Sequence, residues 1–353
     1  MEELNLKYIT IDGRKIGEEY PVFIIAEISA NHNGSKERAL ELIRAAKKVG
    51  ADAVKFQTYT ADTITLKSNK PSFIARGLWS GRTLYDLYSE AYTPWEWHKE
   101  MFDEAKKAGL IAFSSPFDLT AVDFLEELNV PAYKIASYEI NDIPLIKAAA
   151  KKQKPMIIST GIARLRDIEL AVEACREVGN EQILLLKCVS SYPAPMEGTN
   201  LRIIPNMKET FQTAVGLSDH TFGATVPLGA VALGACAIEK HFTFKRSDGG
   251  ADSGFSMEEE EFKDMVLQVR NLEKALGTAD YRLSEKQMEE RKSSRSLFVY
   301  KSVKRGERLS PQNIRSVRPA DGLPPKYYDE VLGKTFTRDI EEGTPLSFDM
   351  IGE

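Results

Sequence analysis

The sequence has too few cysteines to belong among disulfide-rich or zinc-ribbon proteins. It contains three in 353 residues, Cys175, Cys188 and Cys236, and no two of them form a CxxC pair. An odd number of widely spaced cysteines predicts neither a disulfide framework nor a zinc ribbon. This pattern is typical of a reducing compartment, so we expect a cytoplasmic protein.

The sequence also lacks the features of membrane and nucleic-acid-binding proteins. Its longest apolar stretch, Ala224–Ile238, is interrupted by Gly229 and Gly234. It is too short to cross a bilayer core of about 30 Å, and we interpret it as a helix packed on a sheet. The net charge of -5 provides no basic field for nucleic acid. The start, MEELNLKYI, has no basic region followed by an apolar run, so we expect no signal peptide.

What the sequence does contain is a long alternation of short apolar runs and amphipathic segments. The residues up to Tyr20 predict a hairpin around Asp12-Gly13. The predicted strands then read VFIIAEIS, AVKFQT, IAFSS, AYKIAS, MIIST, ILLLKC, AVGLSD and AIEKH, and helices such as Asp167–Val178 and Glu258–Leu276 separate them. This order predicts a closed (β/α)8 TIM barrel. An open doubly wound sheet is the alternative, but no glycine-rich dinucleotide fingerprint follows the first strand.

The pattern changes after the predicted barrel, which we assign to residues 1–283. A charged linker over 284–294, part of it helical, leads to a module of strands and turns over 295–353. In this module Ser302–Ser310 resembles Asp339–Ser347, which is a weak internal repeat. About 60 residues make a marginal core, so we expect the module to dock on a barrel, in its own chain or a partner's. Its Arg318 either forms a surface salt bridge or reaches over a barrel mouth.

The connection Tyr59–Thr93 is unusually long for a loop between a strand and its helix. It holds Trp79, Tyr85 and Tyr88, so we expect it to be ordered. Two interpretations remain open. It is either an aromatic mini-helix packed for stability or a lid over the barrel mouth.

Two of the four histidines follow the seventh and eighth predicted strands, as His220 and His241. Each alone is explained as a polar side chain at a strand end. Adjacent parallel strands lie about 4.8 Å apart, however, so the two imidazoles meet at one edge of the sheet. The paired placement favours a shared metal or substrate site.

Polar side chains also occur at the ends of nearly all the remaining predicted strands. They are Glu27, Lys55, Gln57, Ser115, Lys134, Ser137, Glu139, Ser159, Ser190 and Ser218. Strand ends are polar because loops begin there, which accounts for the serines. It does not account for Lys55 and Lys134, which lie inside apolar strands, where an unpaired charge is costly to bury.

This set of side chains suits a specific reaction. Lysines and hydroxyls bind a phosphate and a carboxylate, the two histidines bind a divalent cation, and Glu27 and Glu139 move protons or recognise sugar hydroxyls. We therefore expect condensation of phosphoenolpyruvate with an aldehyde. The cation would polarise the carbonyl oxygen or order a water molecule.

The motifs that carry these residues resemble those of the sialic acid synthase family. They are AEISANHNG, VKFQTY, KIASYEI, ISTG, SSYPAP, GLSDHT and EKHFT, and RPADGLPP is similar to the signature of the family's antifreeze-like (SAF, β-clip-like) module. The resemblance covers essentially the whole chain. It implies condensation of phosphoenolpyruvate with an open-chain amino sugar, with C–O cleavage and release of phosphate, to give a nine-carbon 2-keto acid.

The resemblance also implies a role for each residue. Phosphoenolpyruvate would be bound by Lys55, Ser115, Lys134, Ser137, Ser159, Ser190 and Ser218. His220 and His241 would hold Mn²⁺ or Mg²⁺. Glu27 would be the acid/base group, and Glu139, Gln57, Tyr192 and Asp252 would lie near the sugar or a metal-bound water. Arg318 would reach the partner's active site in a domain-swapped homodimer.

The choice of acceptor sugar rests on resemblance alone. Sialic acid synthases carry Asn where this chain has Ser190, which disfavours N-acetylmannosamine. The segment Gly77–Trp97 is similar to pseudaminic acid synthases and implies 2,4-diacetamido-2,4,6-trideoxy-altrose as acceptor. The alternatives are an N-acetylneuraminate or legionaminate synthase, a Schiff-base aldolase that uses Lys134 or Lys55, and a non-catalytic protein that binds ice or carbohydrate.

Overall fold

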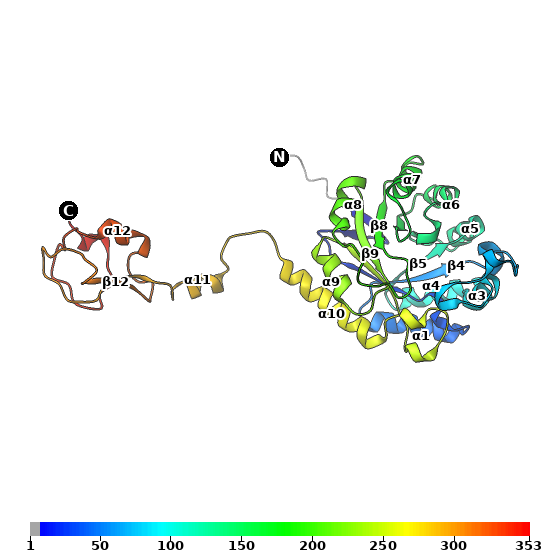
Figure 1. The fold of residues 1–353 in the computed structure, drawn as a ribbon, viewed down its shortest axis with the longest axis horizontal. Coiled ribbons are helices and arrows are strands. Elements are labelled where there is room, and N and C mark those ends of the chain that lie inside the picture. The colour runs from blue at the N-terminus through cyan, green and yellow to red at the C-terminus, as the bar shows by residue number, and fades with distance from the viewer. Residues whose placement is uncertain (1–7) are drawn as a thin grey trace. The chain divides into compact units, whose positions relative to one another are not determined.

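The computed structural model describes residues 8–353. They divide between Gly277 and Thr278 into two compact units, which are described separately below (Figure 1). The division lies a few residues before the linker predicted over 284–294. Of the segment used for the signal-peptide expectation, residues 1–7 lie outside the described range. Across residues 8–353, none of the helices combines the length and the apolar composition that a membrane crossing needs.

The first unit is built on a closed barrel of parallel strands, as predicted, and not on an open sheet. The strands are β3 (Phe23–Glu27), β4 (Ala53–Thr58), β5 (Ile111–Pro116), β6 (Tyr133–Ile135), β7 (Met156–Ser159), β8 (Ile183–Cys188), β9 (Ala214–Asp219) and β10 (Ala237–His241). They follow one another around the barrel in sequence order, and β10 pairs with β3 to close it. Each strand therefore ends at the same mouth.

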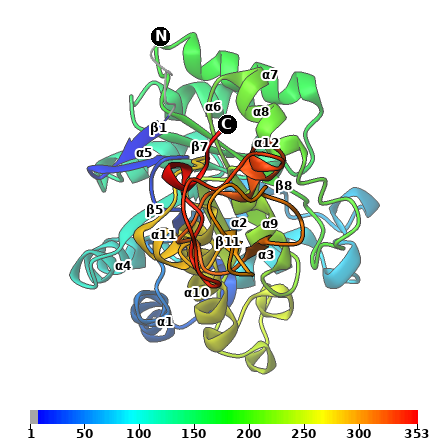
Figure 2. The ribbon, with the colours of Figure 1, turned by 90° about the vertical axis from the view of Figure 1, so that its left-hand side faces the viewer.

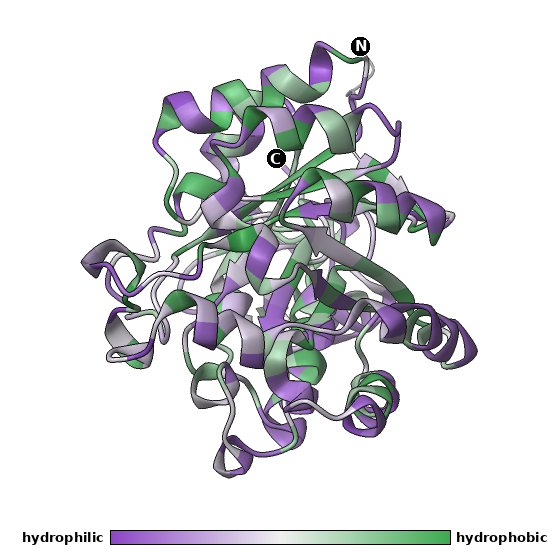
Figure 3. Cartoon of the chain, turned by 90° about the vertical axis from the view of Figure 1, so that its right-hand side faces the viewer, coloured by the Kyte–Doolittle hydropathy of each residue, from purple (hydrophilic) through white to green (hydrophobic). Residues whose placement is uncertain are grey.

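Helices surround the strands (Figure 1). They are α1 (Lys36–Lys48), α4 (Trp95–Lys107), α5 (Leu119–Glu127), α6 (Ile143–Ala150), α7 (Leu165–Arg176), α8 (Ile203–Phe211), α9 (Thr225–Ala232) and α10 (Glu259–Leu276). They carry both hydrophilic and hydrophobic residues (Figure 3), and their apolar positions pack against the strands. Ser35 caps α1 by accepting a hydrogen bond from the amide of Arg38.

The barrel interior follows from the two-residue period of its strands. Apolar side chains such as Phe23, Ile25 and Leu186 fill its lower part. The hairpin of β1 (Tyr8–Ile11) and β2 (Arg14–Gly17) adds Ile9, Ile11 and Ile16 to this cluster, and it confirms the predicted N-terminal hairpin. Two residues further along each strand, the same alternation presents polar side chains at the mouth.

Gly216 is a point of close approach between β9 and β10. A Cβ atom there would lie 2.7 Å from the Ala237 carbonyl oxygen and 2.8 Å from Leu186 Cδ2. No residue larger than glycine fits without moving β10 or the interior layer. Gly216 thus keeps β9 against β10, the two strands that lead to His220 and His241.

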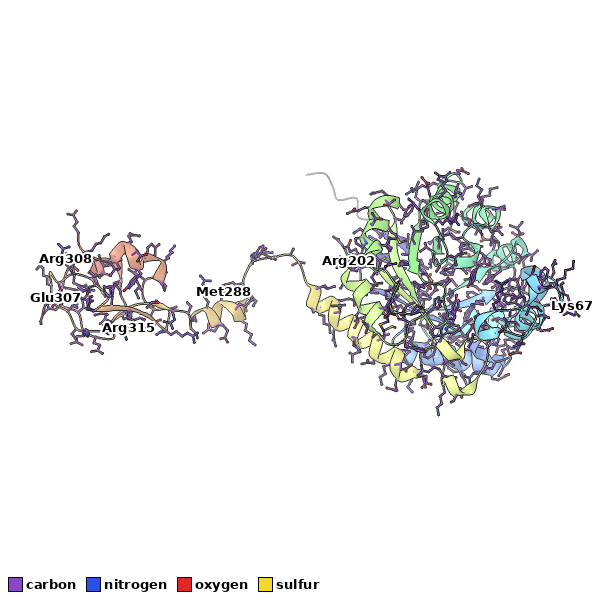
Figure 4. The ribbon with its side chains drawn as sticks, viewed as in Figure 1. Lys67, Arg202, Met288, Glu307, Arg308 and Arg315 are labelled. Carbon is purple, nitrogen blue, oxygen red and sulfur yellow. The ribbon has the colours of Figure 1, made fainter. Side chains whose placement is uncertain are left out.

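The long connection after β4 is ordered and contains α2 (Ala61–Ile64) and α3 (Leu84–Ala91). The Tyr85 hydroxyl donates to Asp62 Oδ1 at 3.1 Å and so ties α3 to α2. Lys67 lies over the Tyr85 ring, 5.5 Å from its centroid, and projects at the outer edge of this unit (Figure 4). The segment therefore has structure of its own and includes the predicted mini-helix.

The second unit contains α11 (Glu285–Arg291), β11 (Ser296–Val299), β12 (Ile314–Val317) and α12 (Tyr328–Val331). β11 and α12 are labelled in Figure 2, and Met288 on α11 in Figure 4. The two halves of the weak repeat pair with each other, since Val303 and Ile340 exchange backbone hydrogen bonds of 2.9 and 3.0 Å. Leu309 and Leu346, which also correspond in the repeat, are buried in the same core.

Candidate active site

Most of the candidate residues lie at the C-terminal mouth of the barrel. Strands supply Glu27, Lys55, Gln57, Ser115, Lys134, Ser159, Ser218 and His241, and the loops that follow supply Ser137, Glu139, Ser190, Tyr192, His220 and Asp252. Glu27 pairs in register with Lys55 on one side and with His241 on the other. Arg318 belongs to the second unit, where it is exposed.

Four charged side chains form a buried cluster inside the mouth. Lys55 pairs with Glu27, and its Nζ lies 3.5 Å from Glu239 Oε1. Lys134 Nζ lies 3.6 Å from the same oxygen, which also accepts a 3.0 Å hydrogen bond from the Ser218 hydroxyl. None of the four charged residues is more than 4% exposed. Since an unpaired charge here would be costly, each group depends on the others.

Two carboxyl groups of this mouth, those of Glu27 and Glu139, have pKa values suited to proton transfer. Burial raises the pKa of Glu27 to about 7, against the opposing effect of Lys55. Burial likewise raises the pKa of Glu139 to about 7. Glu239 differs, because Lys134 and Lys55 outweigh burial and lower its pKa. At neutral pH Glu27 and Glu139 can both donate and accept a proton, whereas Glu239 stays ionised.

The pKa values of the two lysine amines are shifted in opposite directions. Burial lowers the pKa of Lys134, although Glu239 opposes it. The pKa of Lys55 is raised, because Glu239 and Glu27 together outweigh its burial. Lys55 is therefore a fixed cation, and Lys134 is the amine that loses its proton more easily.

The two histidines lie side by side, with ring centroids 5.3 Å apart. His220 Nδ1 is 3.0 Å from the Val189 carbonyl oxygen, which leaves its Nε2 for another ligand. His241 Nδ1 is buried and has no hydrogen-bond partner among the described residues. Burial, together with the nearby His220, holds the pKa of His241 well below its usual value, so this imidazole is neutral.

This pair fits a divalent cation only in part. A ring nitrogen anchored on a backbone carbonyl and a neighbouring neutral imidazole are typical of metal-binding histidines. Within residues 8–353, however, no group of three or more His, Cys, Asp or Glu side chains could hold a metal ion. The donor set therefore suits a cation that takes its other ligands from water or substrate, as open catalytic sites do.

A cavity of about 470 Å³ opens beside His241. Its polar lining includes Gln57, Glu139, Tyr192, His241 and Asp252. A hydrogen-bonded chain orders this lining: Gln57 Nε2 donates to the Ser29 hydroxyl at 2.9 Å, and Ser29 donates to the carboxylate of Asp252. The volume is within the range of pockets for small molecules, about 300–1,000 Å³.

Several buried polar atoms at this mouth have no hydrogen-bond partner among the described residues. They are Glu27 Oε1, Ser115 Oγ, Glu139 Oε2, Ser159 Oγ, Glu239 Oε2 and His241 Nδ1. Buried polar atoms are almost always paired, because an unpaired one costs about 1–3 kcal/mol. Their concentration at one place indicates that a polar ligand completes the site.

The remaining predicted serines meet around one glycine. Ser137 Oγ accepts a 3.0 Å hydrogen bond from the amide of Gly161. A Cβ at Gly161 would come within 2.1 Å of Ser190 Oγ and 2.8 Å of Ser137 Oγ. The glycine of the ISTG motif thus lets both hydroxyls approach the backbone, and the structure brings Ser137 and Ser190 together.

Sequence reasoning missed several side chains of this mouth. The clearest is Glu239, whose signal was available, since it is a carboxylate inside an apolar strand, like Lys55 and Lys134. Cys188 has no such signal: its Sγ lies 3.9 Å from His220 Nδ1. Burial alone would raise the pKa of Cys188, but the contact with His220 lowers it to about 7.

Phe255 was also missed, and Trp79 was named only as part of the connection Tyr59–Thr93, without a partner at the mouth. Phe255 lies 4.9 Å from both Tyr192 and His241, and Trp79 lies 5.9 Å from Tyr192, as centroid distances. Residues in irregular loops carry no periodicity that would predict such contacts.

Comparison with known proteins agrees with this geometry. The NeuB family model matches residues 42–281, and the SAF domain model matches residues 294–352. The chain belongs to the NeuB family. This membership bears out the resemblance to the sialic acid synthases, and the SAF match bears out the predicted C-terminal module.

Relatives of this NeuB-family chain are similar over almost their full length. Pseudaminic acid synthase of Campylobacter jejuni subsp. jejuni (serotype O:23/36, strain 81-176) is 50% identical over 326 residues, which are 92% of this chain and 95% of that protein. Pseudaminic acid synthase of Helicobacter pylori is 47% identical, over 94% and 98%. The crystal structure of N-acetylneuraminic acid synthetase from Leptospira borgpetersenii has a TM-score of 0.73 and 33% identity, and the match covers 81% of this chain and 95% of that one.

The charge cluster makes a prediction about stability. Replacing Glu239 with Gln removes the carboxylate that both lysines share and leaves Lys134 buried without a counter-charge. We expect the free energy of unfolding to fall by about 3 kcal/mol in denaturant titrations. The double variant Glu239→Gln, Lys134→Met should recover part of this loss, because the unpaired charge is gone.

The exposed pair Lys99 and Asp103 provides the control, with nitrogen and oxygen 2.9 Å apart. Lys99→Met should change the free energy of unfolding by less than about 0.5 kcal/mol. Equal losses for Glu239→Gln and Lys99→Met would contradict the assignment of Glu239 to a buried, mutually dependent cluster.

Proposed function

We propose that this chain condenses phosphoenolpyruvate with 2,4-diacetamido-2,4,6-trideoxy-altrose in its open-chain form to give pseudaminic acid and phosphate. Membership of the NeuB family and the similarity to two pseudaminic acid synthases support this reaction. The single structural observation that carries it is the buried pair of lysines beside unpartnered hydroxyls. Lys55 and Lys134 share Glu239, and the hydroxyls of Ser115 and Ser159 lie buried without partners among the described residues.

The reaction forms one carbon–carbon bond and replaces the bond between C2 and the phosphate oxygen with a bond from C2 to the oxygen of a water molecule. C3 of phosphoenolpyruvate bonds to the aldehyde carbon of the sugar, and the aldehyde oxygen takes up a proton. Water adds to C2 and loses one proton. The resulting C2 hydroxyl gives up the second proton and becomes the keto group as the bond between C2 and the phosphate oxygen breaks, and phosphate leaves with the electron pair of that bond. Proton donors and acceptors with pKa values near neutrality serve these proton transfers.

The residues of the mouth divide these tasks by their charge. The phosphate and carboxylate of phosphoenolpyruvate are bound by two lysines and five serine hydroxyls. These residues are Lys55, Lys134, Ser115, Ser137, Ser159, Ser190 and Ser218. Glu27, with a pKa of about 7, is the acid/base group. Glu139, Gln57, Tyr192 and Asp252 orient the sugar in the cavity that they line. Mn²⁺ or Mg²⁺ held by His220 and His241 would supply polarisation of the aldehyde oxygen or an ordered water.

The test of the proposed function is phosphate release from phosphoenolpyruvate with a panel of sugars. The panel contains the altrose acceptor, its manno isomer for a legionaminate synthase, and N-acetylmannosamine for an N-acetylneuraminate synthase. We expect the highest kcat/KM with the altrose sugar. Preference for either of the others would reassign the acceptor, and no release with any sugar would overturn the synthase function.

A Schiff-base aldolase is the second candidate, because one observation favours it. Burial lowers the pKa of Lys134, which is how proteins activate a nucleophilic amine. Borohydride added during turnover would trap a covalent adduct on this lysine if the aldolase assignment were correct. We expect borohydride to trap no adduct. We also expect phosphate release to be lost when a metal chelator is added to the assay.

Glu27→Gln tests the acid/base assignment. The amide keeps the shape of the side chain but cannot exchange a proton, so we expect kcat to fall by about 10²–10⁴-fold. Binding of phosphoenolpyruvate, measured by calorimetry, should stay within a few-fold because Lys55 keeps its contact with Glu239. Loss of that binding would make Glu27 a structural residue. The exposed Glu96→Gln serves as the control and should leave kcat unchanged.

Replacing either His220 or His241 with Ala tests the metal assignment. Each variant should bind Mn²⁺ more than about tenfold more weakly in a calorimetric titration, because one of the two proposed imidazole ligands is lost. Circular dichroism should show an intact fold. An unchanged Mn²⁺ titration in both variants would remove the metal from these histidines, whatever the activity.

We also propose that the chain acts as a domain-swapped homodimer in which Arg318 enters the active site of the second copy. Its support is the exposure of Arg318, which takes part in no ion pair among residues 8–353, and the SAF match of its unit. Mixing Glu27→Gln and Arg318→Ala chains tests the swap. In mixed dimers one site combines an intact Glu27 with an intact Arg318, so roughly one quarter of wild-type activity should return.

The same mixing experiment also has an outcome that would contradict the domain swap. If Arg318 served its own chain, neither site of a mixed dimer would be complete. Mixing the two inactive variants after a cycle of dissociation would then restore no activity. Wild-type chains taken through the same cycle are the control for recovery of the dimer.

A further inference from the structure

The long connection after β4 forms one wall of the cavity. Four residues of α3 line it: Leu84, Leu87, Tyr88 and Ala91. Leu87, Tyr88 and Ala91 follow Leu84 by three, four and seven residues. This spacing places all four on one face of the helix. Ile64 of α2 and Ala75 line the cavity beside them. This set of six residues is called the α3 wall below.

The α3 wall is fixed against the barrel mouth. The indole nitrogen of Trp79 donates a 2.9 Å hydrogen bond to the Ala251 carbonyl oxygen, in the loop after β10. The rings of Tyr59 and Tyr88 lie 5.7 Å apart, in an edge contact that joins α3 to the end of β4. Trp95 donates to the Tyr59 carbonyl oxygen at 3.2 Å and anchors the end of the connection. The α3 wall is therefore a built surface of the cavity.

The cavity lining combines two chemical kinds of residue. Gln57, Arg76, Glu139, His241 and Asp252 supply polar groups, while the α3 wall offers hydrocarbon and the aromatic ring of Tyr88. In the proposed function the aldehyde carbon reacts beside Glu139 and His241. The distal carbons of an open-chain sugar, C5 and C6, are then free to lie against the α3 wall.

We propose that the α3 wall is the specificity-determining surface for the distal end of the acceptor, selecting a methyl group at C6 over a hydroxymethyl group. This inference rests on the proposed function. A C6 hydroxyl placed against Leu84, Leu87 and Ala91 loses its water and gains no hydrogen bond from those side chains, whereas a methyl group gains burial. Hydrophobic pockets reject an added hydroxyl by up to about 10²-fold in kcat/KM.

The experiment compares the altrose acceptor with its 6-hydroxy analogue, which differs only at C6, using phosphate release. The wild-type chain should prefer the 6-deoxy sugar by at least about tenfold in kcat/KM. Leu84→Gln places an amide in the wall, so this preference should fall by about tenfold, mainly through a higher KM for the 6-deoxy sugar. The KM for phosphoenolpyruvate should not change.

Two further variants provide a second test of the α3 wall and a matched control. Ala91→Ser adds one hydroxyl to the wall with almost no change in volume, so it should also reduce the preference even if Leu84→Gln folds poorly. Ser89→Gln lies on the exposed side of the same helix and is the matched control. It should keep the wild-type ratio.

The outcomes separate the two proposals. Phosphate release with neither sugar would overturn the proposed function. Phosphate release with an unchanged 6-deoxy preference in both Leu84→Gln and Ala91→Ser would leave that function standing and overturn the role of the α3 wall. A preference lost equally in Ser89→Gln would also overturn it, because the effect would then come from α3 as a whole.

Discussion

The buried charge cluster of Glu27, Lys55, Lys134 and Glu239 is the constraint on which the rest of this protein depends. Each ion loses its hydration inside the barrel, at a cost of several kcal/mol, and this cost is offset chiefly by its attraction to the oppositely charged members of the cluster. They come from β3, β4, β6 and β10, so the cluster exists only when the barrel closes. The apolar layer beneath it, sealed by the β1–β2 hairpin, keeps water out and makes the pairing strong.

The same burial gives the site its chemistry. Glu27 and Glu139 hold protons near neutral pH because burial penalises their ionised forms. Glu239 stays ionised because Lys134 and Lys55 lie beside it. The buried hydroxyls of Ser115 and Ser159 have no partner among residues 8–353, so a polar ligand that pairs with them would stabilise the fold as it binds.

Much of the barrel was predictable from the sequence because its signals are local. Strand length, the alternation with helices and the polar residue at each strand end can be read within a window of a few residues. That was enough to name Lys55, Lys134 and both histidines. Glu239 carried the same local signal, a charge inside an apolar strand, but nothing in the sequence reveals that two lysines from other strands face it. Trp79 and Phe255 come from irregular loops, where no period exists.

The sequence by itself determined the order of elements, the two-residue alternation inside the barrel and the place along each strand where apolar side chains give way to polar ones. Only the tertiary structure decided which of these meet. Glu27 and His241 become neighbours when β10 pairs with β3. The pKa of Glu27, the partner of Lys134 and the apolar face that α3 turns to the cavity all follow from that closure. Charge pairing and desolvation depend on distances across the barrel, and a linear sequence does not contain those distances.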